Sequence, residues 1–443
     1  MIEISIVSER MRIRVADLAE NPGRLLGTDA ASACLHYCAP THGGWGVIRT
    51  AMLLPEMYML FVCPAACGRH GAIAAIEHGC KERVGYLCIE EHEIVLGSYE
   101  NAIRDTVPQL MAQLDPKPSA MIIVVSCIDD LLGTHYEQMM AEFEAGFGIP
   151  FRLGRMNPIS QGGTLPPGKR IQRDMYDFLD GSVPCDNGVN LLGPFLPLSG
   201  ESELHVLLRE AGMGPVRHVS HYDRFKDFQA MGAAALNLVA RPEGLAAAEN
   251  LEEKLGIPYV VAPVAFSEEG IGARYAAIGA AAGVSFDIDR HLDNMHASAR
   301  QALAKVGART ISIDAGATCS PFDLARCLCE AGFSVCEVFA EHLHEYERSS
   351  FDWLTRHVPD LHVSSPIHHK NAGLRPTRPT ADIAIGFTAA YLSGAPMIAP
   401  ISFDEGLYGC HGTTMIHRAL ENAVASGGEQ HLESIVREYG LVA

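Results

Sequence analysis

The sequence predicts an α/β protein in which parallel sheets are covered by helices on both faces. Short β-branched or apolar runs alternate with amphipathic stretches along the 443 residues, which is the pattern of parallel strands joined by helices. A chain of this length is too long for one hydrophobic core. Loop-rich stretches also interrupt the alternation. We therefore expect three successive α/β units, at 1–185, 186–306 and 307–443.

The first unit is expected to alternate strands with helices. Strands are predicted at 57–62, 84–88, 121–126 and 150–153, and helices at 72–78, 99–114 and 134–147. Two stretches rich in loop-forming residues follow, at 157–174 and 181–188. We interpret both as loops that lead out of this unit.

The same alternation continues through the second and third units. The second unit has predicted strands at 189–192, 215–219, 236–239 and 259–261, and helices at 202–211, 245–255, 272–282 and 289–306. The third has predicted strands at 309–314, 334–339 and 381–385, and helices at 321–331, 346–357 and 411–428. The apolar stretch 381–401 contains Gly386, Gly394 and Pro396, so it fits strand, short helix and strand better than a membrane span.

Charge and cysteine content exclude several classes of protein. The formal charge of −19 argues against nucleic acid as a partner, because phosphate contacts need clustered Lys and Arg. Neither a signal peptide nor a membrane segment is predicted. Thirteen cysteines in a large chain without secretory features favour metal binding or buried thiols over a disulfide framework. We expect a cytoplasmic protein.

Common nucleotide and hydrolase motifs are absent. There is no G-x-G-x-x-G between a strand and a helix, and no G-x-S-x-G. The stretch "GTLPPGKR", 163–170, has Arg170 where a phosphate-binding loop needs Ser or Thr, and it follows no predicted strand. We interpret it as a surface loop.

Three cysteines stand at positions suited to a ligand. Cys67 follows a predicted strand at the start of a helix, and Cys127 directly follows the strand "MIIVVS". The carboxyl ends of parallel strands meet at one edge of a sheet, and Cys38 lies in a Gly-rich loop that could cover that edge. Helix N-termini favour thiolates, which an iron–sulfur cluster requires. Spacing alone leaves open whether these are cluster ligands or unrelated buried thiols.

Seven other cysteines are expected to pack in the interior. They are Cys80, Cys88, Cys185, Cys319, Cys327, Cys329 and Cys336.

Several stretches together resemble the nitrogenase component 1 superfamily. The stretches 38–50, 57–71 and 124–151 resemble the three segments that carry the family's cluster cysteines, and 89–105 resembles the segment between the second and third. The resemblance continues in the second and third units, at 236–260 and 339–354. It implies three Rossmann-like domains around a central cleft.

The resemblance also implies a cofactor and partners. Carried over by position, Cys38, Cys67 and Cys127 are ligands of an iron–sulfur cluster, either [4Fe–4S] or a larger P-cluster-like one. Electrons would come from a separate ATP-dependent iron–sulfur reductase. The protein would form a homodimer, or a heterodimer with a related chain, because three ligands per chain are naturally completed at an interface.

The sequence departs from true nitrogenase where the iron–molybdenum cofactor is bound. Ala240 and Arg241 follow the "LNLV" strand in place of the cofactor cysteine, and 400–402 reads Pro-Ile-Ser where the cofactor histidine is expected. We therefore expect no cofactor of that type and no reduction of dinitrogen. Arg241 either faces an anionic substrate or fills the pocket.

Cys63 is an addition to the family pattern. One alternative is that Cys63 is a fourth ligand, which lets one chain hold a [4Fe–4S] cluster alone. Another is that three cysteines from each of two chains share a cluster across a dimer interface. The third is that Cys63 simply packs under the turn. Cys410 and His411 in "GLYGCHG" are further candidates for the cleft, as are His342 and His344.

The function expected from the sequence is a nitrogenase-like iron–sulfur oxidoreductase component. It would pass electrons through its cluster to a substrate or second cofactor in the cleft. Two alternatives stay open. One is a non-catalytic scaffold for assembly of a metal cofactor, and the other is a protein of this fold whose thiols are free or bind zinc.

Overall fold

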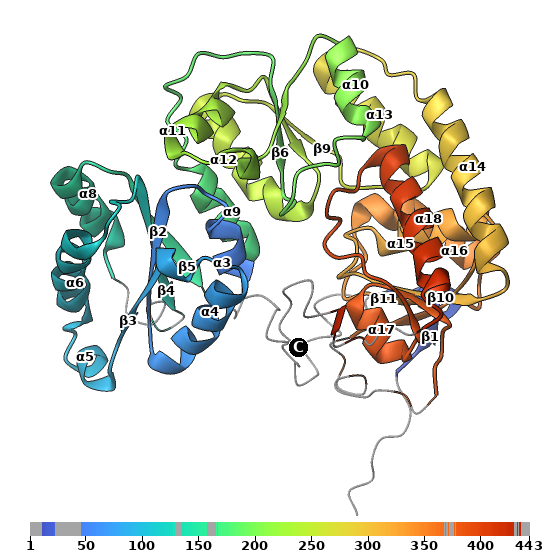
Figure 1. Ribbon diagram of the computed structural model, residues 1–443, viewed down its shortest axis with the longest axis horizontal. Helices are drawn as coiled ribbons and strands as arrows, with labels where there is room; N and C mark the ends of the chain where they lie inside the picture. The colour runs from blue at the N-terminus through green and yellow to red at the C-terminus, as the bar shows by residue number, and fades with distance from the viewer. Residues whose placement is uncertain are drawn as a thin grey trace, which may run out of the picture.

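Three sheets flanked by helices form an arch in the computed structural model (Figure 1). The structure describes residues 11–22, 46–126, 128, 134–156, 165, 167–366, 368, 371, 376, 378–428, 432 and 434–435. The predicted fold class, α/β with several parallel sheets flanked by helices, is confirmed. Among the described residues, no helix is long and apolar enough to cross a membrane.

The first sheet has four parallel strands in the order β3-β2-β4-β5. Its strands are β2 (Met57–Cys63), β3 (Val84–Cys88), β4 (Ala120–Ser126) and β5 (Phe151–Met156). All seven residues of β4 are buried, as expected for a strand covered on both faces. The helices α3 (Gly46–Ala51), α4 (Ala65–Glu77) and α9 (Pro167–Tyr176) lie on one side, and α5 (Glu91–Val95), α6 (Tyr99–Gln113) and α8 (Tyr136–Phe147) on the other (Figure 1).

The second sheet is also parallel, in the order β7-β6-β8-β9. Its strands are β6 (Val189–Leu192), β7 (Val216–Arg217), β8 (Leu236–Val239) and β9 (Tyr259–Val261). Its helices are α10 (Glu203–Glu210), α11 (Phe225–Phe228), α12 (Leu245–Leu255) and α13 (Glu268–Ala282). The two central strands are tied by a buried hydrogen bond from Asn190 Nδ2 to Asn237 Oδ1 at 2.9 Å.

The third sheet has six strands in the order β1-β12-β11-β10-β13-β14. They are β1 (Ile13–Arg14), β10 (Thr310–Asp314), β11 (Ser334–Phe339), β12 (His362–Ser364), β13 (Ile383–Ile385) and β14 (Met397–Ala399). The short helix α1 (Val15–Leu18) follows β1, and the other helices are α14 (Asp289–Val306), α15 (Pro321–Glu330), α16 (Arg348–His357), α17 (Phe387–Ser393) and α18 (Gly409–Ala425).

Two segments join the third sheet's layer from outside the expected range of 307–443. The strand β1 pairs antiparallel with β12, with Ile13 opposite Val363. Helix α14 packs against α18. The division of the chain at residues 185 and 306 stays a prediction, and these two contacts cross it.

One expected loop contains a helix. The interpretation of 157–174 as a loop is wrong from Pro167 onward, where α9 begins. Proline is compatible with the first turn of a helix, since the N–H it lacks would have no partner there. The buried residues Ile171 and Met175 are four apart and form the inward face of the helix. The prolines and glycines before this helix are typical of loops, so the sequence did not predict it.

The three sheets share their hydrophobic cores. Leu192 and Val239 of the second sheet belong to the same buried cluster as Met57 and Phe61 of the first. Residues on the other face of the second sheet, such as Leu191 and Leu238, share a cluster with residues of β10 and β11. The contact between sheets is therefore part of the interior of the molecule.

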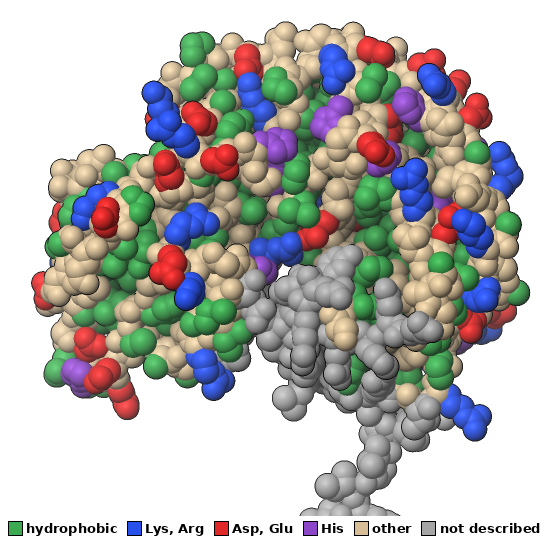
Figure 2. Space-filling model, viewed as in Figure 1, with side chains coloured by type: hydrophobic (Ala, Val, Ile, Leu, Met, Phe, Trp, Pro, Cys, Tyr) green, Lys and Arg blue, Asp and Glu red, His purple; other side chains and the backbone are tan. Residues whose placement is uncertain are grey.

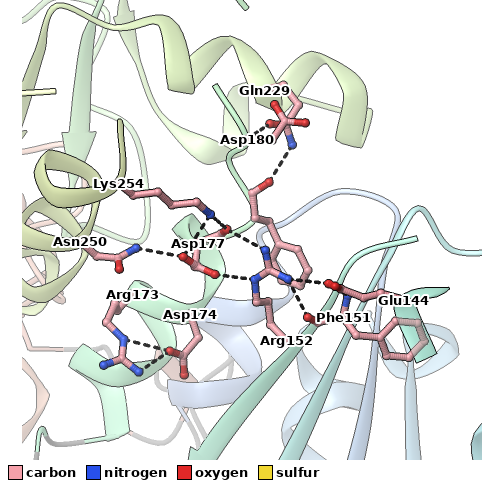
Figure 3. A network of polar contacts seen from close by, with 11 residues as sticks. Glu144, Phe151, Arg152, Arg173, Asp174, Asp177, Asp180, Gln229, Asn250 and Lys254 are labelled. Atoms are coloured by element: carbon pink, nitrogen blue, oxygen red, sulfur yellow. Dashed lines mark hydrogen bonds and ion pairs between the residues drawn. The ribbon is translucent and has the colours of Figure 1, made fainter. Parts of the chain in front are cut away.

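A network of polar contacts ties β5 to α9 and α12 (Figure 3). Arg152 of β5 donates from Nε to Asp177 Oδ2 at 2.5 Å and from Nη1 to Glu144 Oε1 at 2.8 Å. Asp177 lies just after α9 and also accepts hydrogen bonds from Asn250 and Lys254 of α12, each at 3.2 Å. This network fixes the first sheet against the second unit.

Candidate functional site

Three cysteines lie at the carboxyl edge of the first sheet. Cys63 is the last residue of β2 and pairs in register with Cys88, the last residue of β3. Cys67 lies in the first turn of α4, directly after β2, and its N–H donates to Pro64 O at 2.9 Å. Cys63 is fully buried, Cys67 half-buried and Cys88 exposed. The predicted position of Cys67, after a strand and at a helix start, is the one observed.

The environment of Cys63 favours its neutral thiol. Burial, with smaller contributions from the nearby thiols of Cys67 and Cys88, raises the pKa of Cys63 to about 12. A side chain at the Gly68 position would meet Cys63 Sγ at 3.2 Å, so this thiol is packed closely under the start of α4. Whether Cys63 packs here or binds a cluster stays a prediction.

The other two predicted ligands, Cys38 and Cys127, lie outside the described residues. Cys127 directly follows Ser126, the last residue of β4, and Val125 of β4 pairs with Val62 of β2. Among the described residues, no three His, Cys, Asp or Glu side chains form a group that could hold a metal ion. The described part of the chain therefore contains one of the three predicted ligands.

Cys88 was not recognised as part of this edge from the sequence. The expected strands at 57–62 and 84–88 were correct, but their relative register was not predicted. Parallel pairing of Met59 with Val84 brings Cys88 level with Cys63. The signal that could have placed Cys88 beside Cys63 is that each cysteine is the last residue of its predicted or observed strand, and the two strands are neighbours.

A second group of residues lies where the second and third units meet. Arg241 follows β8 and forms an ion pair with Asp404, which follows β14. Arg241 Nε also lies 3.3 Å from Glu243 Oε2, and its guanidinium lies 5.7 Å from the ring centre of Phe403. Arg241 is 4% exposed and Asp404 1% exposed. Burial opposes the charged arginine, but Glu243 and Asp404 together raise its pKa, so it stays protonated.

Cys319 and Tyr346 complete the third unit's part of this group. The N–H of Cys319 donates to Asp404 Oδ2 at 2.8 Å, and Tyr346 Oη donates to the Cys319 carbonyl at 2.8 Å. Burial raises the pKa of the Cys319 thiol well above its usual value, and the carboxylate of Asp404 adds to this shift. Cys319 is therefore a neutral thiol in the structure.

The first unit contributes Arg49 from α3. Its guanidinium pairs with Glu405 and lies 4.4 Å from the ring centre of Phe195, which follows β6. Phe195 and Phe403 then pack edge to face, with centroids 5.5 Å apart. We call the residues Arg49, Phe195, Arg241, Phe403, Asp404 and Glu405 the three-unit junction. In Figure 2, basic and acidic side chains lie side by side where the first unit, on the left, meets the rest of the molecule.

Two histidines follow β11 near this junction. The ring of His344 stacks on that of Tyr346, with centroids 5.0 Å apart. The ring centroids of His342 and His344 are 6.2 Å apart. Burial lowers the pKa of His344, and the neighbouring His342 lowers it further, while Glu243 acts in the opposite direction. His344 is therefore a neutral imidazole beside the charged groups of the junction.

Cys410 and His411 lie at the start of α18. Their N–H groups donate to the two carboxylate oxygens of Glu203, at 2.6 and 3.0 Å. Burial raises the pKa of the Cys410 thiol, and Glu203 adds to the shift. Tyr275 Oη donates to the same carboxylate at 2.7 Å. The observed contacts of Cys410 and His411 thus stabilise a helix N-terminus.

Residues 43–371 match the family of nitrogenase component 1 type oxidoreductases. The chain belongs to this nitrogenase component 1 type family. The matched residues include Cys67, Cys127 and Arg241, while Cys38, Cys410 and His411 lie outside them. The predicted family resemblance is confirmed.

Solved structures show the same fold. Nitrogenase Cp1 at pH 6.5 has a TM-score of 0.66 and 13% sequence identity, covering 89% of this chain and 95% of that chain. Nitrogenase Cp1 at pH 5 has a TM-score of 0.58 and 15% identity, covering 89% and 91%. No curated protein matches the sequence significantly. At this level of identity, the likeness to nitrogenase Cp1 concerns the fold.

Proposed function

We propose that this nitrogenase component 1 type protein is an iron–sulfur oxidoreductase component that passes electrons to a substrate or second cofactor in a cleft between its three units. The observation that carries the proposal is the alignment of strand ends in the first sheet. Cys67 follows β2, and Cys127 follows the neighbouring strand β4 in the sequence. Ligands of parallel α/β sheets bind at this edge.

The chemistry of the described thiols fits a cluster ligand at Cys67. A helix N-terminus and partial exposure both favour a thiolate, which is the form that binds iron. Cys38, Cys67 and Cys127 would hold the cluster, and a bound iron–sulfur cluster would supply electron transfer. Cys63 is a buried neutral thiol, so we assign it to packing under α4.

The residues at the three-unit junction do not fit a nitrogenase-type iron–molybdenum cofactor. At the position of the expected cofactor cysteine stands Arg241, whose charge is neutralised by Asp404 and Glu243. A guanidinium cannot deprotonate to bind a metal. Because its charge is already paired inside the protein, we assign Arg241 to joining the second and third units, in preference to binding an anionic substrate.

The partners follow from the same proposal. A cluster with three cysteine ligands in one chain is completed by a second chain, so we propose a homodimer or a heterodimer with a related chain. A separate ATP-dependent iron–sulfur reductase would deliver the electrons. We propose a cytoplasmic setting, because an iron–sulfur site of this kind needs reduced thiols.

Metal analysis of anaerobically purified protein tests the proposal. We expect at least about two irons per chain, with matching acid-labile sulfide, in the wild type. Cys67→Ala should lose most of this iron, whereas Cys63→Ala should keep it. Cys185→Ala provides the control, because Cys185 is an exposed cysteine at the end of the first unit, outside the strands of the first sheet.

Fewer irons in the wild type, or full iron retention in Cys67→Ala, would contradict the cluster. Electron transfer is then tested separately, with an added iron–sulfur reductase and ATP. An oxidoreductase component consumes electrons while its iron content stays constant. Release of the bound cluster to an acceptor protein, without consumption of electrons, would instead identify an assembly scaffold.

A further inference from the structure

Two cysteines at the carboxyl edge of the first sheet are direct neighbours across two strands. Cys63 ends β2 and Cys88 ends β3, and they are the last of five residue pairs in register, which begin with Met59 and Val84. The N–H of Ile89 donates to the Cys63 carbonyl at 3.0 Å, so the hydrogen bonding between the strands continues past both cysteines. The backbone therefore fixes the two cysteines side by side.

Both thiols point to the face of the sheet that α4 covers. Successive residues of a strand point to opposite faces, so each cysteine shares a face with the residue two positions before it. These residues are Phe61 and Tyr86, whose rings pack edge to face with centroids 6.0 Å apart. Phe61 and Cys63 belong to one buried cluster with residues of α4, and Tyr86 packs against it.

The spacing of the strands suits a bond between the two sulfur atoms. Neighbouring strands lie about 4.8 Å apart, and disulfides join residues whose Cα atoms are about 4.4 to 6.8 Å apart. An in-register pair whose side chains point to the same face meets this condition. A disulfide between Cys63 and Cys88 can therefore form without a change in how the strands pair.

The two thiols differ in their access to solvent. Cys88 is exposed, whereas Cys63 is fully buried beneath the start of α4. A dissolved reagent can therefore reach Cys88 but not Cys63. The Cys63 sulfur can react only with another sulfur inside the protein, and Cys88 is its partner across the strands.

We propose that Cys88 and Cys63 form a redox-active pair that reduces a small-molecule disulfide. The Cys88 thiolate attacks one sulfur of the reagent and forms a mixed disulfide, while the other half leaves as a thiolate and takes up a proton. The Cys63 sulfur then attacks the Cys88 sulfur, gives its proton to the departing thiolate and closes the intramolecular disulfide. Two electrons thus pass from two protein thiols to the reagent, which becomes two thiols.

Cystamine is a suitable probe, because it is a small disulfide with two ammonium groups. The segment after Cys88 is acidic, with Glu90 and Glu91 exposed, and attracts a cation. Anaerobically purified protein is incubated with cystamine, its remaining thiols are alkylated, and its tryptic peptides are analysed by mass spectrometry. Cleavage after Arg69 and Arg83 places Cys63 and Cys88 in separate peptides.

In the wild type, we expect a mixed disulfide on Cys88 to appear first. Because Cys63 gives up its proton only in the second step, this step is the slower one. Within hours, a disulfide between the two peptides should replace the mixed disulfide.

Removal of the buried thiol should trap the mixed disulfide. At the end of the reaction, Cys63→Ala should carry at least about ten times more mixed disulfide on Cys88 than the wild type, because a neighbouring thiol reacts much faster than a dissolved one. In Cys88→Ala, the buried Cys63 should stay unmodified. Cys185 is the internal control, because it is exposed and should keep its mixed disulfide in every variant.

Cys67→Ala distinguishes Cys63 from Cys67, since both lie in the same tryptic peptide. The link to Cys88 should persist in Cys67→Ala and be absent from Cys63→Ala. Two results would overturn the proposal, provided that circular dichroism shows a folded protein. One is a link that persists in Cys63→Ala, and the other is a wild-type mixed disulfide on Cys88 that lasts as long as the one on Cys185.

Neither result depends on a cluster. Cys67→Ala removes a predicted cluster ligand, but neither step of the proposed reaction uses Cys67. The redox-active pair and the proposed electron-transfer function can therefore fail independently.

Discussion

Asp174 shows how burial changes the chemistry of a single residue. This residue of α9 is 6% exposed, and its Oδ1 accepts a hydrogen bond from Arg173 Nη2 at 2.8 Å. Its Oδ2 has no partner among the described residues. Burial raises the pKa of Asp174 to about 6, although the charges of Arg173 and Arg170 oppose the shift. Compared with the unfolded chain, the folded protein therefore favours the protonated form of this carboxyl.

Asp174→Asn should stabilise the protein more at high pH than at low pH. The folded-state pKa is raised, so the ionised carboxylate destabilises the fold above about pH 6, and this cost disappears as the pH falls towards the unfolded value near 4. We expect a gain of about 1 to 3 kcal/mol in the free energy of unfolding at pH 8, and about a third of that gain at pH 4.5. Urea denaturation at both values measures this.

The control is Asp105→Asn, which changes an exposed carboxyl on α6. Its effect should be small and the same at both pH values. A gain at pH 4.5 as large as that at pH 8 would show that the charge of Asp174 is not the cause.

At the residue scale, the sequence predicted positions better than partners. Cys67 was predicted at a strand end and helix start because both features depend on a short stretch of sequence. The partner of Arg241 could not be predicted, since Asp404 comes from another unit. The same applies to Cys410 and His411, whose proximity to Glu203 depends on how α18 packs against α10.

At the scale of elements, α9 connects the first unit to the second. It contacts β5, α3 and α12, and Gln172 Nε2 donates to the carbonyl of Gly193 after β6, at 2.8 Å. Burial alone would raise the pKa of Asp177, but the hydrogen bond from Asn250 and the charges of Arg152 and Lys254 lower it. The carboxylate of Asp177 is thus the form that stabilises this connection.

Arg152→Met should weaken the connection in a pH-dependent way. The folded-state pKa of Asp177 is depressed, so its stabilising effect is complete above the unfolded value near 4 and is lost as the pH falls through the folded value. We expect a loss of about 1 to 2 kcal/mol in the free energy of unfolding at pH 7, and a smaller loss below pH 4. Urea denaturation across this range gives both values.

Arg104→Met is a matched control, since Arg104 pairs only with the exposed Glu142 among the contacts of its side chain that the structure describes. Exposed pairs contribute at most about 1 kcal/mol. Equal losses for the two variants at pH 7 would mean that the Arg152 network adds no more than an ordinary surface pair.

At the scale of the whole molecule, local patterns predicted the sheets but not their connections. The strands at 84–88, 189–192 and 236–239 have the predicted bounds, because a buried strand between turn residues is recognisable from its own sequence. The pairing of β1 with β12 joins distant parts of the chain, and no periodicity reports it. The hydrophobic clusters shared between sheets could not be predicted either, since the sequence does not indicate which sheet an apolar residue contacts.

The buried pair Arg241–Asp404 provides a measure of how strongly the second and third units are coupled. Both charges are almost fully buried, so Arg241→Met leaves Asp404 charged without its counterion, whereas Asp404→Asn leaves Arg241 with Glu243 as its remaining partner. Asp404 also accepts the N–H of Cys319 at 2.8 Å, and Asp404→Asn keeps an oxygen for this bond. Arg241→Met keeps the length of the side chain without the charge.

We expect Arg241→Met to lose about 3 to 5 kcal/mol in the free energy of unfolding, Asp404→Asn to lose less because Glu243 still pairs with Arg241, and the double variant to lose less than the sum. The reason is that in the double variant neither Arg241 nor Asp404 is left as a buried charge without the other. Urea denaturation of the four proteins gives the coupling energy, which should exceed about 1.5 kcal/mol. Lys305→Met and Glu421→Gln form the control cycle, because this pair also links two helices, α14 and α18, but its Lys305 side chain is half exposed. Additive losses for Arg241 and Asp404, within about 0.5 kcal/mol, would mean that their ion pair does not couple the two units.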